Sequence, residues 1–467
     1  MPERIGLDLG TSTITAVLVD SHAGTVRHSR FLHNDSNLPA LAPTRAEQDP
    51  ARLRALALEV ITGLAARAEQ VEAIGVTGQM HGLVCVDRAG EPLTSLVTWQ
   101  DRRSAEPGPG GAALMDELYA RLADLRWQDN GCQISHGYGA ATLFWLARHG
   151  AIPPGTERVC SLPDWLAAQL AGQPPVTDPT LACSWGAYSL IEKGWNLALI
   201  QQLGLDPCLF PPVRPSGEPL GGLLSCVARQ VGLPAGIPVL NALGDHPASF
   251  LASVASAASA ATTAGNGDLS HTVQINLGTG GQIAWWVPAF EPPDERAETH
   301  PCPGGGCLRV GASLCGGAAY AWLNRTVRAW LAEFGVELDE GTVYARLNRA
   351  ARDADAAGLR VRPTFLGVRG DPAVQAGAIE GITLDNLRLA ALARATLLGL
   401  IDELRDLYLT RATAAIRAGH RLLVASGNGV QKNPLLPGLL AERFGLPVEL
   451  PRWPEPAAVG AAVATGR

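Results

Sequence analysis

Apolar and polar positions follow the same pattern in two stretches of the chain that lie far apart in the sequence. The first, Ile5 to Asp20, reads IGLDLGTSTITAVLVD, and the second, Thr272 to Val287, reads TVQINLGTGGQIAWWV. Each has an apolar run, a Leu-Gly-Thr turn and a second apolar run, which is the pattern of a β-hairpin. Two copies of one hairpin in a single chain indicate an internally duplicated structure.

Strand-like and helix-like segments alternate through much of the remaining chain. A helical stretch is predicted over Pro50 to Gln70, with strands at Ala73 to Thr77 and Leu83 to Asp87. Later strands are predicted at Pro238 to Asp245 and Arg421 to Ser426. This alternation is typical of α/β proteins, whose ligands bind at the ends of strands.

The length and the charge set bounds on the class of protein. A chain of 467 residues is longer than one hydrophobic core usually supports, so we expect two domains, residues 1–250 and 251–467. The net charge of -7, without a basic run, argues against nucleic acid or an anionic membrane as a partner. Nine scattered cysteines and a start without the pattern of a secretory signal favour a cytoplasmic protein.

The turns of the two hairpins are candidate phosphate sites. Glycines let the backbone approach an anion closely, and backbone N–H groups and hydroxyls can then donate to phosphate oxygens. Only the first copy has a carboxylate, Asp8, where the second has Asn276. Because Mg²⁺ prefers oxygen ligands and accompanies nucleotide phosphates, we expect one nucleotide between both turns, with the metal beside Asp8. Two ordinary hairpins are the alternative interpretation.

Polar residues on other loops are candidates for the second substrate. The loop GQMHG, with Gln79, Met80 and His81, and the segment TWQDRR, with Trp99 and Asp101, each follow a predicted strand. Ordinary loop hydrogen bonding and core packing remain alternatives for these side chains.

Asp245 ends an apolar strand and precedes a helix of small residues. Such an aspartate can cap the helix, or it can serve as the base that phosphoryl transfer requires at the acceptor hydroxyl.

A third glycine-rich segment follows the strand that ends at Ser426. Gly427 and Gly429 fit the start of a dinucleotide fingerprint, and Glu449 stands where a ribose-binding acid is expected. Lys432 occupies the third glycine position, however, and too little chain follows for the remaining strands of that fold. A site for the base of a nucleotide, with Asn428 or Asn433 as hydrogen-bonding groups, is the favoured interpretation.

Taken together, these segments resemble the FGGY family of carbohydrate kinases. The motifs that carry the resemblance are, in chain order, DLGTS, GVTGQMHG, TWQDRR, ALGDHPAS, NLGTGGQ, SLCGGAAYAWL, PTFLGVR, ASGNGVQKNPLL and EPAAVGAAVA. The resemblance implies an α/β fold with duplicated actin/hexokinase-like (ribonuclease H-like) ATPase domains flanking a central cleft. Within the family, the chain is most similar to the sedoheptulokinase subfamily.

The resemblance also implies a role for each matching position. Asp245 matches the catalytic aspartate, which would deprotonate the sugar hydroxyl, and Asp8 would hold Mg²⁺ mainly through water. The residues implied to line the phosphates of ATP are Gly10, Thr11, Ser12, Thr13, Gly278, Thr279, Gly280 and Gly281. Those implied on the adenosine side are Gly316, Gly317, Gly427, Asn428, Gly429 and Asn433. Those implied on the sugar side are Gln79, Met80, His81, Trp99, Asp101 and Asp245.

Two positions depart from the family pattern. Thr15 stands where many relatives have a lysine or arginine, so a cation near the phosphates is missing unless Arg102 or Arg369 replaces it. The pair Gly280 and Gly281 is smaller than the residues that sedoheptulokinase-like chains often carry, so specificity for xylulose stays open.

The sequence therefore predicts ATP- and Mg²⁺-dependent phosphorylation of a ketose at a primary hydroxyl, with sedoheptulose as the favoured acceptor and sedoheptulose 7-phosphate as the product. A xylulokinase-like or other FGGY sugar kinase is the first alternative. A nicotinamide-dependent oxidoreductase and a non-catalytic actin-like ATP-binding protein are remoter ones. The pattern leaves a homodimer open.

Overall fold

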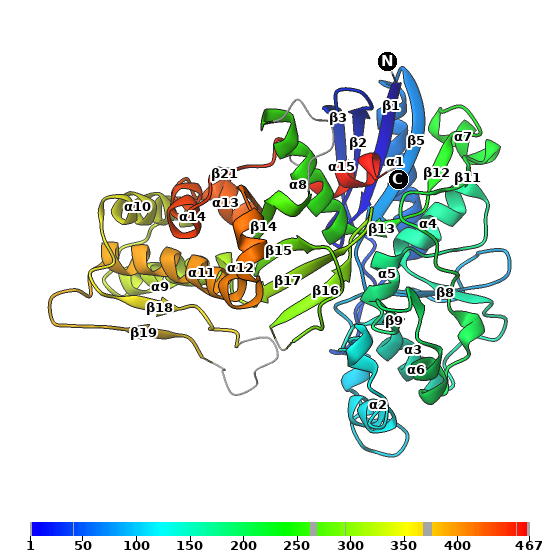
Figure 1. Ribbon diagram of the computed structural model, residues 1–467, viewed down its shortest axis with the longest axis horizontal. Coiled ribbons are helices and arrows are strands. Elements are labelled where there is room, and N and C mark those ends of the chain that lie inside the picture. The colour runs from blue at the N-terminus through cyan, green and yellow to red at the C-terminus, as the bar shows by residue number, and fades with distance from the viewer. Residues whose placement is uncertain are drawn as a thin grey trace.

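Two α/β units lie side by side in the computed structural model of the protein (Figure 1). The structure describes residues 2–40, 42–261, 269–294, 296–367, 376–453 and 455–464, without the side chains of 256–261. Each unit has a central mixed sheet, which confirms the α/β fold and the expected internal duplication.

The sheet of the first unit has the strand order β11-β12-β5-β1-β2-β3, with β13 beside β5. Its strands are β1 (Pro2–Leu9), β2 (Thr13–Asp20), β3 (Val26–His33), β5 (Gln70–Gly78), β11 (Pro219–Gly222), β12 (Pro238–Leu240) and β13 (Leu243–Gly244). The first predicted hairpin forms β1 and β2, and β1 pairs in parallel with β5 on its other side.

The sheet of the second unit repeats this arrangement with the order β16-β17-β15-β14-β20-β21. Its strands are β14 (Thr272–Leu277), β15 (Gly281–Val287), β16 (Ala297–Pro301), β17 (Cys307–Ser313), β20 (Leu422–Ser426) and β21 (Val448–Glu449). The second predicted hairpin forms β14 and β15, and β14 pairs in parallel with β20. The duplicated hairpins therefore occupy matching places in the two sheets.

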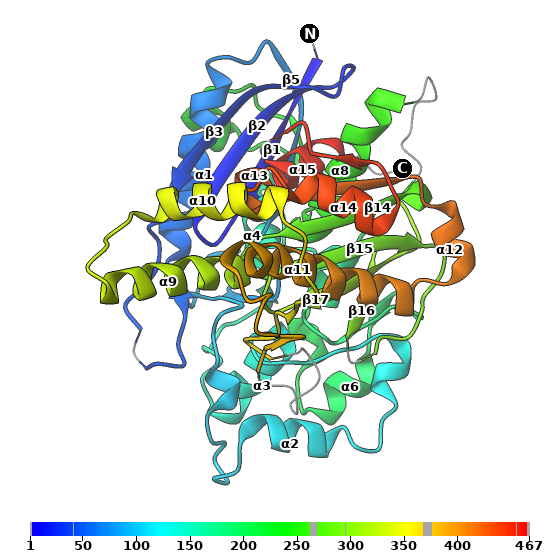
Figure 2. The ribbon, with the colours of Figure 1, turned by 90° about the vertical axis from the view of Figure 1, so that its left-hand side faces the viewer.

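Helices cover these sheets with separate apolar cores. Residues of α1 (Pro50–Ala65), α4 (Leu162–Ala171) and α7 (Ser225–Val231) pack on the first sheet. The second sheet is packed by residues of α9 (Gly317–Glu333), α10 (Glu340–Asp353), α11 (Leu389–Arg411) and α14 (Leu436–Phe444). Figure 2 shows α9, α10 and α11 side by side on the second unit.

A third cluster lies beside the first sheet and is rich in aromatic residues. It includes residues of α2 (Leu114–Arg121), η2 (Trp127–Asn130), α3 (Gly139–Arg148) and α6 (Leu197–Gln202). The short strand pairs are β4 (Glu47–Gln48) with β7 (Leu96–Val97), β6 (Val84–Val86) with β8 (Arg158–Cys160), β9 (Tyr188–Ser189) with β10 (Gly194–Trp195), and β18 (Arg360–Arg362) with β19 (Ala378–Glu380).

Two predicted elements differ from the observed ones. Helix α1 ends at Ala65, because the chain from Gln70 onward joins the first sheet as β5. The strand predicted over Pro238 to Asp245 is interrupted at Asn241, whose amide donates to the carbonyl oxygens of Arg214 and Pro215, both 3.0 Å away.

The C-terminal helix returns to the first unit. Helix α15 (Pro456–Val463) packs against β1, β5 and α8 (Asp245–Ala261), as Figure 1 shows by the red helix beside the blue strands. A Cβ atom at Gly460 would overlap the carbonyl oxygen of Ala248, so this contact requires glycine. The small residues of Pro456 to Thr465 predict a helix that packs tightly on the small-residue segment after Asp245 and forms a hinge region. The packing is confirmed up to Ala464, Thr465 lies outside the described residues, and the hinge stays a prediction.

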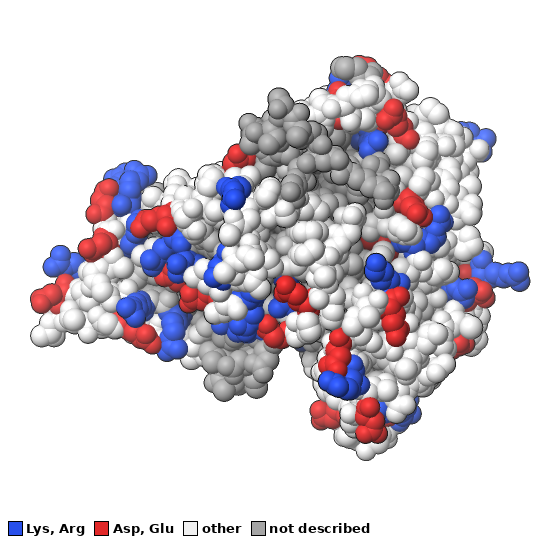
Figure 3. All heavy atoms as spheres, viewed as in Figure 1, with Lys and Arg blue, Asp and Glu red and all other residues white. Residues whose placement is uncertain are grey.

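No helix within the described part of the chain is long and apolar enough to span a membrane. On the face shown in Figure 3, cationic and anionic side chains are interspersed, without a broad patch of one sign. The predicted division after residue 250 falls inside α8.

Candidate active site

Asp8, on β1 just before the first turn, has one carboxylate oxygen without a partner among the described residues. Asp8 lies opposite Thr15 in β2 and beside Thr77 in β5. Its Oδ1 atom is buried and accepts no hydrogen bond from any described residue. Burial raises the pKa of Asp8 well above its ordinary value, and the charges of Asp245 and Glu455 raise it further. The site is therefore short of positive charge.

This donor set fits a magnesium ion. Mg²⁺ is usually held by one or two carboxylates, with water and phosphate oxygens completing its shell. Asp8 offers an unpaired oxygen, and a cation there would relieve the repulsion from Asp245 and Glu455. Among the described residues, no cluster of three or more His, Cys, Asp or Glu side chains forms a full protein cage. The site therefore suits a metal ion that binds together with the phosphates of a nucleotide.

Asp245 lies at the same end of the sheet as Asp8. Strand β13 pairs in parallel with β5 next to Thr77 and Gly78, and Asp245 follows it as the first residue of α8. Burial raises the pKa of Asp245 to about 6, although the backbone N–H of His246 opposes the rise. Its Oδ1 accepts from that N–H at 2.7 Å, whereas a capping aspartate accepts from residues two or three positions further on.

The loop after β5 brings Gln79 and Met80 to this place. A Cβ atom at Gly244 would lie 2.7 Å from the sulfur of Met80, so this side chain packs directly on the residue before Asp245. Gln79 is buried and donates to Gln48 at 2.8 Å, while its Oε1 accepts from no described residue. Gln79 therefore offers a buried acceptor that a substrate hydroxyl can fill.

His81 is held in an unusual conformation. Its φ of 72° is in the left-handed region, which is uncommon for residues other than glycine. Nδ1 lies 2.6 Å from the carbonyl oxygen of Ser184, so Nδ1 donates, and the ring stacks on Tyr138 with centroids 4.3 Å apart. The orientation of the imidazole is thus set by α5 (Pro179–Ser184) and by Tyr138.

Trp99 connects the predicted sugar side with the first turn. The indole N–H donates to the hydroxyl of Thr11 at 2.9 Å, and 46 % of the residue is exposed. Gln48 also donates to the carbonyl oxygen of Thr11, at 3.3 Å. The exposure of the Trp99 ring favours the interpretation that it offers an apolar face to a substrate over the interpretation that it packs at the edge of a hydrophobic core.

Asp101 is buried in a network of protein hydrogen bonds. The residue is 1 % exposed, and its carboxylate accepts from Arg103 at 2.8 Å and from the backbone N–H of Ala46 at 2.9 Å. Arg103 also pairs with Glu47. These protein partners bond to both oxygens of Asp101, and the direct sugar contact expected of this residue stays a prediction.

The first turn, Gly10 to Thr13, is held from behind by a residue that the sequence did not single out. Asn34 is buried and donates to the carbonyl oxygens of Gly10 and Thr11, at 3.0 and 3.1 Å. Ser12 and Thr13 are exposed at the tip. The replacement proposed for the missing cation at Thr15 finds no support: Arg102 is exposed, and Arg369 lies outside the described residues.

The second turn is covered by two glycine segments. The N–H of Gly317 donates to the carbonyl oxygen of Gly278 at 2.8 Å, and a Cβ atom at Gly316 would overlap the carbonyl oxygen of Gly280. Gly427 has a φ of 93°, and a Cβ atom there would lie 2.6 Å from the carbonyl oxygen of Leu277. Only glycine meets both conditions at that position.

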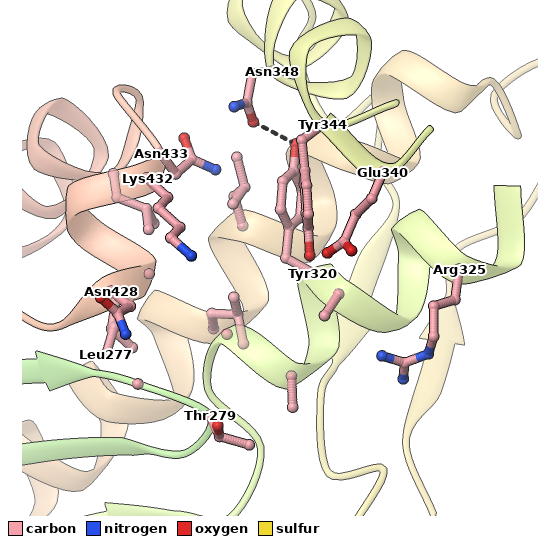
Figure 4. Close-up of a pocket in the computed structure, with 18 residues that line it drawn as sticks. Leu277, Thr279, Tyr320, Arg325, Glu340, Tyr344, Asn348, Asn428, Lys432 and Asn433 are labelled. Carbon is pink, nitrogen blue, oxygen red and sulfur yellow. Dashed lines mark hydrogen bonds between the residues drawn. The ribbon is translucent and has the colours of Figure 1, made fainter. Parts of the chain in front are cut away.

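A cavity of about 620 Å³ opens beside this second turn (Figure 4). Six residues predicted from the sequence line it: Gly278, Thr279, Gly317, Asn428, Gly429 and Asn433. Asn433 is 5 % exposed, and its Nδ2 atom donates to no described residue. The cavity therefore contains a buried donor, as a site for a heterocyclic base requires.

Other residues of this cavity were missed. They lie on α9 and α10, where a helical pattern of aromatic and polar residues is normally attributed to packing: Tyr320, Arg325, Glu340, Tyr344 and Asn348. Tyr320 donates to Asn348 at 2.9 Å and stacks on Tyr344. Lys432, on α13 (Asn428–Lys432), points its amine toward the cavity in Figure 4.

Family comparisons agree with this geometry. Residues 4–252 match the N-terminal domain of the FGGY family of carbohydrate kinases, and residues 287–467 match its C-terminal domain. The chain is 28 % identical to sedoheptulokinase of Mus musculus, over 96 % of this chain and 94 % of that protein. It is 30 % identical to glycerol kinase of Thermus brockianus, over 100 % and 90 % of the two chains.

Solved structures share the fold. A xylulose kinase from Rhodospirillum rubrum superposes with a TM-score of 0.79 at 23 % identity, covering 99 % of this chain and 90 % of the other. A gluconate kinase from Lactobacillus acidophilus also gives 0.79, at 20 % identity, with 99 % and 88 % covered. At these identities the likeness establishes the two-unit architecture only.

Proposed function

The chain belongs to the FGGY family of carbohydrate kinases, and we propose that it transfers the γ-phosphoryl group of ATP to a primary hydroxyl of a ketose. Sedoheptulose is the proposed acceptor, and sedoheptulose 7-phosphate the product. The observation that carries the proposal is the proximity of Asp245 and Asp8 between a phosphate-type turn and the loop of Gln79. A base, a metal ligand and anion donors are the groups that phosphoryl transfer needs.

Asp245 acts as the general base. With a pKa of about 6 it is largely ionised at pH 7, yet it holds a proton more strongly than an ordinary aspartate does. It accepts the proton of the acceptor hydroxyl as that oxygen attacks the γ-phosphorus in line with the leaving oxygen. The new O–P bond forms as the bond to the β-phosphate oxygen breaks.

The two turns hold the triphosphate from opposite sides. Gly10 to Thr13 and Gly278 to Gly281 direct backbone N–H groups and hydroxyls at the β- and γ-phosphates. Asp8 would hold Mg²⁺. When bound, the ion neutralises charge on the transferring oxygens.

The base and ribose of ATP occupy the cavity beside the second turn. Asn433 donates to the base through its unpaired Nδ2, and Tyr320 and Tyr344 form the opposite wall. Gly316, Gly317, Gly427, Asn428 and Gly429 line the approach to the phosphates. Lys432 supplies positive charge in this half of the site, where Thr15 supplies none in the other.

The sugar binds at the loop after β5. Gln79 accepts from a hydroxyl through its unpaired Oε1, Met80 and the exposed ring of Trp99 contact carbon atoms, and His81 orders the loop. The similarity to sedoheptulokinases over nearly the full length of both chains supports a seven-carbon ketose. A xylulose kinase is the second candidate, since a kinase with that name shares the fold.

The same proposal places the enzyme in a reducing cytoplasm. All nine cysteines are free thiols, seven of them buried. A homodimer remains compatible with these observations.

Release of ADP from ATP and Mg²⁺ tests the proposal. Sedoheptulose, xylulose, ribulose, fructose and glycerol are compared in parallel, with wild type and with Asp245→Asn. Turnover by wild type that is greatest on sedoheptulose supports both substrate and base. Greater turnover on another sugar would identify that sugar as the substrate and leave the proposed mechanism unchanged. ATP binding without turnover of any sugar leaves a binding protein, and thermal stabilisation by NAD instead of ATP indicates an oxidoreductase.

A further inference from the structure

A second cavity of about 620 Å³ lies between the two units, apart from the one beside the second turn. One wall comes from the first unit, between Tyr119 and Tyr138, and the other from the second unit, between Pro293 and Ala312. The volume lies within the range of small-molecule sites. None of the residues predicted from the sequence to bind a substrate lines this interdomain cavity.

Two contacts join this cavity to the catalytic loops. Tyr138 lines the cavity and stacks on His81. On the opposite wall, Glu298 bonds to His300 at 2.9 Å, and the ring of His300 lies 6.5 Å from that of His246, the residue after Asp245. The walls of the cavity are thus linked through Tyr138 to the sugar loop and through Glu298 and His300 to the residue after Asp245.

The walls combine apolar faces with polar groups, as carbohydrate sites do. The rings of Tyr119 and Trp127 are nearly parallel, 14° apart, with centroids separated by 6.4 Å. Tyr119 is fixed by a bond from its hydroxyl to the carbonyl oxygen of Ile134 at 3.0 Å. Such rigid aromatic faces contact the C–H groups of a sugar.

The polar side chains of the first wall are available to hydroxyls. Within the described part of the chain, the side chains of Gln128, Gln133 and Ser135 make no hydrogen bond. Across the cavity, the Nε atom of Arg296 is buried without an acceptor among the described residues. Amides and hydroxyls both donate and accept, which suits a polyol.

We propose that this cavity binds the carbons and hydroxyls of the sugar that are remote from the phosphorylated end, so that it selects a long-chain polyol over a short one. The inference rests on the proposed kinase function and deepens it. A three-carbon acceptor fills the space at Asp245, whereas a six- or seven-carbon chain extends between the glutamines and Arg296. Discrimination by chain length then resides in residues 119–138 and 293–312, outside the motifs of the phosphate turns.

The test uses the double variant Gln128→Ala/Gln133→Ala, with Gln201→Ala/Gln202→Ala on α6 as a matched control. The control likewise removes two amides without side-chain hydrogen bonds to described residues; Gln201 and Gln202 are both exposed, whereas in the test variant Gln128 is exposed and Gln133 half-buried. Calorimetric titration with sedoheptulose should show about a tenfold or greater loss of affinity in the first variant, since two neutral hydrogen bonds to the sugar are lost. The control should match wild type.

Kinetics provide the second readout. The ratio of kcat/KM for sedoheptulose to that for glycerol should fall by about tenfold in the cavity variant. Unchanged affinity for sedoheptulose and an unchanged kcat/KM ratio in the cavity variant would overturn the inference and leave the kinase proposal intact. The same holds if the wild-type protein binds no sugar longer than glycerol. If no sugar yields ADP but the cavity variant still loses sedoheptulose affinity, the kinase proposal fails and the binding site stands.

Discussion

The two hairpin turns of this protein are built on the same backbone plan and differ in one decisive side chain. In each unit, the first strand of the hairpin pairs in parallel with a neighbour whose end opens into a loop. Asp8 and Asn276 occupy matching positions, beside Thr77 and Ser426 of those neighbours. Asp8 has a buried carboxylate oxygen that no described residue pairs, while Asn276 is a neutral amide packed against Gly427.

The residues around Asp8 and Asn276 also differ in charge and in the loops that they belong to. Near Asp8, the carboxylates of Asp245 and Glu455 raise its pKa, and the adjacent loop carries Gln79. Near Asn276, the adjacent loop carries Gly427 and leads into a cavity with an unpaired amide donor. The comparison shows one hairpin plan with two different sets of side chains. We propose that the first set serves the metal and the acceptor, and the second set the base of the nucleotide.

The largest effect should come from making the first turn resemble the second. Asp8→Asn removes the proposed metal ligand, so we expect kcat to fall by about a hundredfold or more, with a higher Mg²⁺ requirement. Steady-state kinetics over a Mg²⁺ series measure both quantities. Wild-type kcat and Mg²⁺ dependence in this variant would show that Asp8 holds no metal.

The reverse exchange should have a smaller effect. Asn276→Asp adds a negative charge behind the second turn, and repulsion from the phosphates should raise KM for ATP by about tenfold, with less change in kcat. KM for ATP at saturating sugar is the measurement. If Asn276→Asp instead lowers kcat as strongly as Asp8→Asn does, the division of work between the turns is wrong.

A substitution at Gly427 separates steric overlap from backbone strain. In Gly427→Ala the added Cβ atom would overlap Leu277 and Asn276, and the φ of 93° is itself unfavourable for alanine. We expect a loss of about 2–4 kcal/mol in stability together with weaker ATP binding. Gly24→Ala is the control, because its φ of 62° is also positive but open space surrounds it. It should cost about 1 kcal/mol and leave ATP binding unchanged. Equal losses in thermal unfolding would contradict the close packing at the second turn.

The smallest expected effect is on how the thermal stability of the ligand-free protein changes with pH. The folded-state pKa of Asp245, about 6, lies above the ordinary value of 3.8, so its ionisation weakens the fold. That penalty is complete above about pH 6 and vanishes below about pH 4. Asp245→Asn should therefore melt a few degrees higher than wild type at pH 7.5, about equal to it at pH 4. A lower melting temperature at pH 7.5 would contradict the burial of this charge.

Much of the fold could be predicted because it depends on local patterns. The second hairpin was predicted over the residues that form β14 and β15, since alternation of apolar residues and a glycine turn are visible in sequence. The end of α1 and the break at Asn241 could not be, because sheet pairing and a bond to a distant loop determine them.

The same distinction between local sequence patterns and long-range contacts applies to the candidate site. Glycine motifs and Asp245 were recognisable, since their chemistry requires those residue types. Glu455 was not, because only the return of α15 to the first sheet brings it near Asp8. Tyr320 and Tyr344 look like core residues on helices, and the hydrogen bonds from Arg103 to Asp101 are visible only in the structure.

The pH dependence of kcat/KM tests the central claim, that Asp245 is the base between the metal turn and the sugar loop. With ATP, Mg²⁺ and sugar all below saturation, where the rate reports the free enzyme, wild type should lose activity below about pH 6, tenfold per pH unit. Asp245→Asn should lack this limb and turn over about a thousandfold more slowly. A wild-type rate that stays level from pH 7 down to pH 5, or an Asp245→Asn variant that retains most of the activity, would contradict the account.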